Sequence, residues 1–183
     1  LLPLLAHRCA DPDAQTRKFA SFAVGNAGFH SARLYGHLTP TVAPLVECLI
    51  DPDPKTRANA AGALGNLARN GAQLCAELLA QGVPGALLRL AIRVTSPGCD
   101  DFAPTPQEAP MALEDAASEA GSLLRAARTA LFSLGNLAAH AACRKDLTDL
   151  NVAASLRPLA EHVDPLLRQY AGRVLQKLGQ TDR

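Results

Sequence analysis

Residues 51–68 read DPDPKTRANAAGALGNLA, and the rest of the chain repeats this pattern. It stands 40 residues earlier as DPDAQTRKFASFAVGN at 11–26. Two further copies follow, SLGNLA at 133–138 and a decayed one that begins with DPLLR at 164–168. A period near 40 residues is typical of helical repeat arrays, in which each unit buries its apolar face against its neighbours. The sequence therefore predicts an α-solenoid of about three to four repeats of roughly 40 residues.

Each copy indicates a turn followed by an amphipathic helix. Asp53 can accept hydrogen bonds from the first N–H groups of a helix, and Pro54 suits the first helical position. Alanines and leucines then follow at helical spacing, until Asn70-Gly71 supplies a stop signal. Each unit is expected to hold two shorter helices besides this long one, called its third helix, in one repeat domain over 1–183. The third helices are predicted near 13–29, 53–69, 122–139 and 164–178.

The composition independently indicates an all-α protein. Ala and Leu make up 65 of the 183 residues, whereas Val and Ile together number 10. Ala and Leu suit helices, while sheets favour β-branched and aromatic residues. No apolar run approaches the roughly 18 residues of a membrane-spanning helix, so we expect no membrane partner. The five cysteines lie too far apart for a zinc site, and we expect reduced, mostly buried thiols in a cytoplasmic protein. They are Cys9, Cys48, Cys75, Cys99 and Cys143.

An acidic, proline-rich insertion separates the second and third copies. Segment 95–121 carries six acidic residues and no Lys or Arg, which favours a loop, although the composition turns helix-forming from Ala112. It is either a solvated loop or an acidic flap that competes for a basic groove. Without those six acids, 18 basic residues face 11 acidic ones, a formal charge of +7. Such a charge favours acidic partners through long-range attraction.

One position near the end of the predicted third helices holds an asparagine in three copies. Its side-chain amide carries donors and an acceptor that could grip an extended peptide backbone, or could instead bond the adjacent repeat. Phenylalanine stands four residues earlier in two copies, and Gly62 takes that place in the other. We predict that these side chains line the concave groove of the solenoid and bind an extended peptide or a helix of another protein. The predicted groove residues are Asn26, Asn66, Asn136, Phe22 and Phe132.

A second recurring pair is an aspartate followed six residues later by an arginine. Asp11 with Arg17, and Asp51 with Arg57, are expected to form a ladder that stacks the repeats. Catalytic sequence motifs and metal-ligand spacings are absent, so we predict no enzyme activity, cofactor or metal for this segment. No basic cluster surrounds the seven aromatic residues in the sequence, which argues against a nucleic-acid partner.

Residues 57–68 resemble the third helix of an armadillo repeat, with its groove-lining asparagine. The resemblance implies a right-handed armadillo/HEAT-like α-solenoid, and the spacing of six between Asp and Arg is HEAT-like. Nuclear-import adaptors of this superfamily place a Trp four residues before the asparagine, where this chain has Phe22, Gly62 and Phe132.

The stretches 19–29 and 57–67 are most similar to the C-terminal repeat region of Fused-type serine/threonine kinases. This resemblance implies a regulatory or scaffolding region, with an upstream kinase domain, that helps assemble the central apparatus of motile cilia or acts in signalling. It places the protein in the cytoplasm or the ciliary axoneme, with kinesin or axonemal central-apparatus proteins as partners. The alternatives are an importin-like adaptor for linear peptide motifs and a module that binds microtubules through tubulin tails.

Overall fold

The computed structural model describes residues 2–69, 72–95 and 114–179, with side chains from Gly121 onward in the last range. The described residues form helices and turns without a strand, as the composition predicts. The α-helices are α1 (Leu2–Cys9), α2 (Ala14–His30), α3 (Tyr35–Leu38), α4 (Val42–Cys48), α5 (Pro54–Arg69), α6 (Cys75–Ala80), α7 (Val83–Ile92), α8 (Glu114–Leu137), α9 (Ala141–Asp149), α10 (Val152–Ala160) and α11 (Pro165–Leu178).

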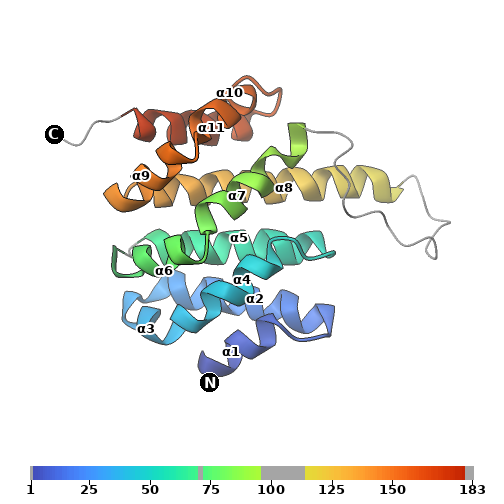
Figure 1. The fold of residues 1–183 in the computed structure, drawn as a ribbon. Helices are drawn as coiled ribbons and strands as arrows, with labels where there is room; N and C mark the ends of the chain where they lie inside the picture. Colours follow the sequence, from blue (N-terminus) through green and yellow to red (C-terminus); the bar gives the residue numbers. More distant parts are fainter. Residues whose placement is uncertain (1, 70–71, 96–113, 180–183) are drawn as a thin grey trace.

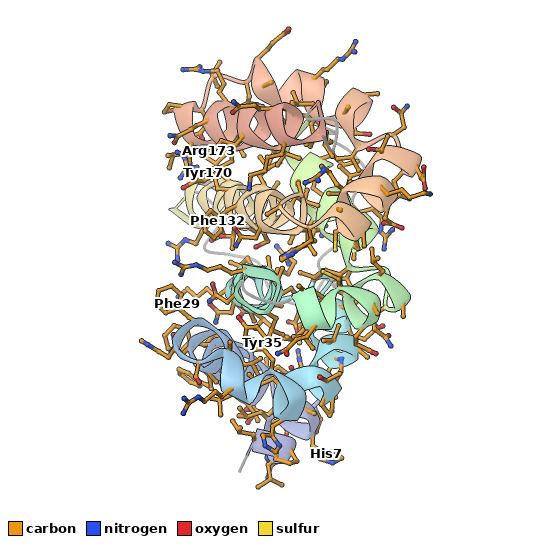
Figure 2. The ribbon with its side chains drawn as sticks, turned by 90° about the vertical axis from the view of Figure 1, so that its left-hand side faces the viewer. His7, Phe29, Tyr35, Phe132, Tyr170 and Arg173 are labelled. Atoms are coloured by element: carbon orange, nitrogen blue, oxygen red, sulfur yellow. The ribbon has the colours of Figure 1, made fainter. Side chains whose placement is uncertain are left out.

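The helices form two layers that run the length of the molecule (Figures 1 and 2). The long helices α2, α5, α8 and α11 pack side by side in chain order and make one layer. The shorter helices, from α1 to α10, make the other layer and pack against the long ones. The structure is therefore a stack of helical repeats, and the long helices are the predicted third helices.

The third helix that follows the insertion begins before residue 122, in line with the helix-forming composition from Ala112 onward. Thr95 ends a 3-10 turn after α7, and α8 begins at Glu114, before the predicted start at 122. The reason is the run of Ala, Glu and Leu from Ala112 onward, which favours helix. Residues 96–113 lie outside the described residues, so both interpretations of the acidic segment stay predictions. The stop signal at Asn70-Gly71 also lies outside them.

Three of the third helices, α2, α5 and α11, begin at or directly after the Asp-Pro pattern. The Asp53 carboxylate accepts a hydrogen bond of 2.9 Å from the Thr56 N–H, and Pro54 is the first residue of α5. Asp13 and Asp164 cap α2 and α11 in the same way, by accepting from the N–H three residues on. A capping side chain of this kind stabilises a helix by about 1 kcal/mol, because it satisfies an otherwise unpaired N–H.

Small residues bring neighbouring third helices into close contact. Ala60, Ala61 and Ala63 of α5 are fully buried, and so are the alanines that face them from α8. The tightest point is Gly65, where a Cβ atom would lie 2.8 Å from the Ser133 Cβ and closer still to its hydroxyl oxygen. Ser133 donates a hydrogen bond of 2.8 Å to the Ala61 carbonyl across the same interface. Helix spacing in the stack thus depends on residue size at these positions.

The cysteines of the described residues are part of the core. Cys9, Cys48, Cys75 and Cys143 are buried and free of disulfides, as predicted, while Cys99 lies outside the described residues. Burial raises the pKa of the Cys9 thiol to about 12 and that of Cys48 to about 11, which suppresses the reactive thiolate.

None of the described helices is by itself long and apolar enough to cross a membrane. Residues 72–80 and 83–95 reach that length and hydropathy only as a pair, bent by 73°. Apolar side chains of this pair, Leu78 and Leu87 among them, lie buried in the core.

Substituting Gly65 by alanine should lower stability, because the new methyl group has no room against Ser133. Overpacking of this kind costs about 1–3 kcal/mol. Gly62→Ala is the matched control, since its Cβ would meet only the Thr129 methyl group at 3.5 Å, and alanine favours helix. Thermal unfolding followed by circular dichroism measures both. Equal midpoints for the two variants would contradict the close approach, and Gly65→Ala combined with Ser133→Gly should recover stability.

Candidate functional site

One surface of the stack is formed by outward-facing residues of the four third helices, which recur on one side of each helix at spacings of 3, 4, 7 or 11 residues. We call this surface the third-helix face. Figure 2 shows Phe29, Phe132, Tyr170 and Arg173 along it, on the side away from the shorter helices. All its residues are exposed or partly exposed. They are Phe19, Phe22, Asn26 and Phe29 on α2, Lys55, Asn66 and Arg69 on α5, Arg125, Phe132 and Asn136 on α8, and Tyr170, Arg173 and Lys177 on α11.

The asparagines link each third helix to the previous one. The Asn66 amide donates a hydrogen bond of 2.9 Å to the Gly25 carbonyl, and the Asn136 amide one of 3.0 Å to the Gly65 carbonyl. Lys177 takes the same place on α11, and its ammonium donates to the Gly135 carbonyl at 2.5 Å. The acceptor is in every case the glycine that precedes the equivalent position of the neighbouring repeat.

The glycines explain why this row of hydrogen bonds between repeats, the asparagine ladder, can form. A Cβ on Gly25 would contact the Ala63 backbone of α5 at 3.5 Å, so the two helices already lie at van der Waals distance. A carbonyl oxygen has two lone pairs, and the one not used within its helix can accept from the side chain of the next repeat. The recurring Gly-Asn pair was a visible sequence signal for these bonds. Lys177, which replaces asparagine, gave no such signal.

In Asn66 and Asn136, therefore, the amide NH2 group has a structural role, whereas the side-chain oxygen is available to a partner. The amide groups of Asn66 and Asn136 donate between repeats, which is one of the two roles considered from the sequence. Among the described residues, their side-chain oxygens and that of the exposed Asn26 accept no hydrogen bond. These oxygens remain able to accept an N–H group from a peptide.

Large aromatic side chains stand on the third-helix face in the open. Phe22 and Phe132, both predicted as groove residues, expose 54% and 43% of their surface, and Phe19 exposes 63%. Phe132 on α8 also packs edge-on against Tyr170 of α11, with ring centroids 5.9 Å apart. A contiguous set of exposed apolar side chains on a folded protein marks an interaction surface more often than isolated ones do.

A cation lies over each of three of the aromatic rings. The Arg69 guanidinium of α5 lies 4.9 Å from the centre of the Phe29 ring on α2. Arg173 lies 5.9 Å from the centre of the Tyr170 ring, and Lys18 lies 5.1 Å from that of Phe19. Arg69 and Phe29 are far apart in the sequence, and only repeat stacking joins them.

The third helices are rich in basic residues, although α8 also carries Glu114, Asp115 and Glu119 before Gly121. Residues 14–30, 54–69, 122–137 and 165–178 contain ten Lys and Arg and no Asp or Glu. The aspartates nearest to them, such as Asp53, are the helix caps, whose charge is engaged by N–H groups and hydroxyls at the helix start. The face is therefore basic as well as aromatic.

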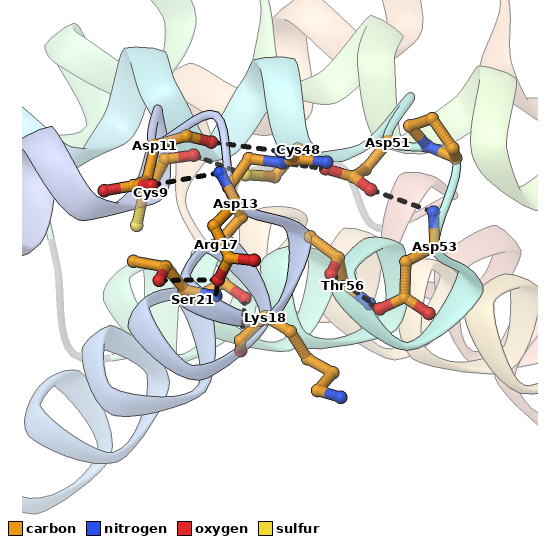
Figure 3. Close-up of polar contacts among 12 residues, drawn as sticks. Cys9, Asp11, Asp13, Arg17, Lys18, Ser21, Cys48, Asp51, Asp53 and Thr56 are labelled. Atoms are coloured by element: carbon orange, nitrogen blue, oxygen red, sulfur yellow. Dashed lines mark hydrogen bonds and ion pairs between the residues drawn. The ribbon is translucent and has the colours of Figure 1, made fainter.

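Of the residues predicted to form a stacking ladder, Arg17 and Asp51 form an ion pair between two repeats, at the turn that leads into α5 (Figure 3). Arg17 donates to the Asp51 carboxylate of the next repeat at 2.5 Å, and also to the Asp11 carbonyl at 3.0 Å. Arg57 donates to the Asp51 carbonyl at 2.7 Å. The Asp11 carboxylate instead pairs with the exposed Arg8 of its own repeat. Asp51 is buried, so this ion pair ties two repeats together away from bulk solvent.

The last repeat keeps this turn with different residues. His162 stands where Asp51 does, and its Nδ1 accepts from the Asp164 N–H at 3.0 Å. Arg168 donates to the His162 carbonyl, as Arg57 does to that of Asp51. Arg128 of α8 reaches the Asp164 carboxylate instead and lowers the pKa of that carboxyl to about 2. Sequence comparison alone missed this pair, because Arg128 is shifted by one position from Arg17.

No group of three or more His, Cys, Asp or Glu that could hold a metal ion occurs within the described parts of the chain.

Comparison with known proteins agrees with this geometry. A model of the HEAT-like repeat matches residues 14–67. A designed armadillo repeat protein superposes with a TM-score of 0.74 at 19% identity, over 97% of this chain and 64% of its own. Another, from a set designed for modular peptide recognition, gives a TM-score of 0.75 at 19% identity, with the same coverage.

The chain has the fold of an armadillo/HEAT-like α-solenoid. Its all-α solenoid class, predicted from the sequence, is confirmed. A third designed armadillo repeat protein, solved in complex with the peptide (KR)4, has a TM-score of 0.51 at 17% identity, over 97% of this chain and 82% of its own. The solenoid spans about 64% of the length of the first two designed proteins. No curated protein is significantly similar to it in sequence.

Replacing Asn66 by alanine should destabilise the solenoid by about 1 kcal/mol, since the Gly25 carbonyl then loses a hydrogen bond between repeats. Asn26→Ala is the matched control, because Asn26 is exposed and, among the described residues, its side-chain amide bonds no other third helix. That variant should keep or slightly raise stability through the better helix propensity of alanine. Urea unfolding measures both, and an equal loss in the two variants would refute the structural role of the Asn66 amide group.

Proposed function

We propose that the solenoid is a non-catalytic scaffold that holds an extended peptide of a partner protein on its third-helix face. The observation that carries the proposal is a row of exposed aromatic side chains beside available amide oxygens on one surface. Phe22 lies one helical turn before Asn26, and Phe132 one turn before Asn136. An extended peptide needs pockets for its side chains and acceptors for its backbone N–H groups. An aromatic ring beside an asparagine side-chain oxygen offers both.

The exposure of these rings supports a partner, because contact between apolar surface and water is unfavourable and a bound partner would cover that surface. Covering an aromatic side chain the size of Phe contributes about 1.5–3 kcal/mol when its apolar surface leaves water. The designed armadillo protein in complex with (KR)4 is a solenoid of related fold that holds a peptide. In the present chain the chemistry of the bound peptide must follow from its own side chains.

We propose further that the solenoid is the C-terminal region of a Fused-like serine/threonine kinase, working in the cytoplasm and the axoneme of motile cilia. The support is the resemblance of residues 19–29 and 57–67 to that region in sequence. Kinesin and central-apparatus proteins are then the expected partners.

The importin-like alternative is disfavoured by charge. Reading a basic motif needs carboxylates on the binding surface, because Lys and Arg side chains must be paired when they leave water. The third helices have no Asp or Glu within 14–30, 54–69, 122–137 and 165–178.

Replacing Phe22 and Phe132 together by alanine should reduce partner capture more than tenfold, because buried aromatic anchors contribute about 2 kcal/mol or more each. Affinity purification from ciliated cells with quantitative mass spectrometry measures it. The matched control is Ile50→Ala with Val163→Ala, two exposed apolar residues in the turns outside the face.

Equal partner loss in both double variants would overturn binding at the third-helix face. If kinesin and central-apparatus proteins are absent from the captured set, the kinase proposal fails while the scaffold proposal stands.

The positive third helices favour one second candidate, a module that binds the acidic tails of tubulin. Cosedimentation with microtubules should then be strong at low salt and weaken as salt screens the charges. No cosedimentation at low salt would eliminate this candidate.

A further inference from the structure

We propose that the peptide held by the third-helix face is acidic, with Asp or Glu side chains placed between apolar anchors. This inference rests on the proposed peptide-binding function and names the chemistry of the partner. It follows from which cations of the solenoid are already paired and which are not.

The paired cations stand at the turns. Arg17 and Arg128 contact carboxylates of the next repeat, and Arg168 donates to turn carbonyls. Their charge is engaged in holding the repeats together, so they contribute little to recognition.

The unpaired cations stand on the third-helix face. Lys55, Arg69, Arg125 and Arg173 are exposed, and among the described residues none of them forms an ion pair with a carboxylate. Like charges gathered on one surface repel one another, and a bound anion relieves that repulsion. Four such cations on three successive helices are complementary to several carboxylates along one chain.

The positions of the acidic residues sharpen this charge separation. Asp13, Asp53 and Asp164 cap the helix starts, and Thr16 and Thr56 hydroxyls donate to the first two. Glu47, Glu77, Asp146 and Asp149 belong to the shorter helices of the other layer. Among the described residues from Gly121 on and before Thr95, no carboxylate of the third helices themselves opposes the cations.

The asparagine side chains of the third-helix face favour a peptide over a nucleic acid. Asn26, Asn66 and Asn136 present side-chain oxygens, which are acceptors and can bond the N–H groups of a peptide backbone. A sugar–phosphate backbone offers acceptors at its phosphates and would leave those oxygens facing its negative charge. The aromatic rings suit apolar side chains between the acidic ones, and three of these rings already lie under cations.

Helix spacing sets the length of the peptide. Packed helices lie about 8–10 Å apart, so four third helices span about 30 Å. An extended chain rises about 3.3 Å per residue, so about nine or ten residues cover the face.

The test uses three fluorescein-labelled peptides of about ten residues that alternate Leu with Glu, Gln or Lys. Fluorescence anisotropy should show the Glu peptide binding at least about tenfold more tightly than the Gln peptide, a difference of about 1.4 kcal/mol. Binding of the Glu peptide should weaken as salt rises, and the Lys peptide should bind least.

Reversing charge on the face locates the site. Lys55→Glu with Arg125→Glu should weaken binding of the Glu peptide at least about tenfold and improve binding of the Lys peptide. The matched control is Lys145→Glu with Arg157→Glu, the same change of charge at exposed positions on α9 and α10. The control should alter affinity less than about twofold, and circular dichroism should show both variants folded.

Each result decides the inference. Equal affinity for the Glu and Gln peptides, both lost in the Phe22→Ala and Phe132→Ala variant, would overturn the acidic partner and leave peptide binding intact. No binding by any of the three peptides would overturn both. Equal weakening by the two charge-reversed variants would reject the site. A single-stranded oligonucleotide that displaces the Glu peptide and binds more tightly would make the face a nucleic-acid site instead.

Discussion

The geometry of the third-helix face depends on how closely neighbouring third helices approach one another. Gly65 against Ser133 is the narrowest point, and it keeps α5 and α8 at a distance that a methyl group would not permit. At that distance an asparagine amide can reach the carbonyl of the preceding repeat, as Asn136 does with Gly65. At the preceding interface, between α2 and α5, Arg17 forms an ion pair with Asp51. A repeat protein has no other source of rigidity, because its stability comes from contacts between neighbouring units.

This close approach of the helices gives different roles to different groups of the same side chain. The asparagine nitrogen is used inside the stack, which leaves the oxygen on the surface. In the same way, the Phe132 ring packs against Tyr170 on one edge and exposes the rest. Side chains that are anchored in this way lose little further entropy when a partner binds, which favours affinity. The contacts that stabilise the stack thus also hold the side chains of the third-helix face in place.

The basic side chains are divided in the same way, into those that bond within the stack and those that face solvent. The arginines at the turns donate to carbonyls and carboxylates of the stack, and these bonds make them structural. The cations further along the third helices have no such partners, and they give the surface its sign. A near-neutral chain with a formal charge of +1 therefore presents a strongly positive surface, since its acidic residues lie at the helix caps, on the other layer and in segment 95–121.

The sequence by itself determined the repeats, the helical class and the starts of α2, α5 and α11, because these depend on local spacing: a cap acts on an N–H three residues away, and a stripe of alanines is visible at helical period. It also placed Asn66 and Phe22 on one surface. Only the tertiary structure decided what those side chains do. The Asn66 amide bonds Gly25, Arg69 covers Phe29, and Arg128 pairs with Asp164, each across some 36 to 41 residues of chain. Such contacts depend on the offset between stacked helices, which is set by packing at glycine and alanine and has no local signature.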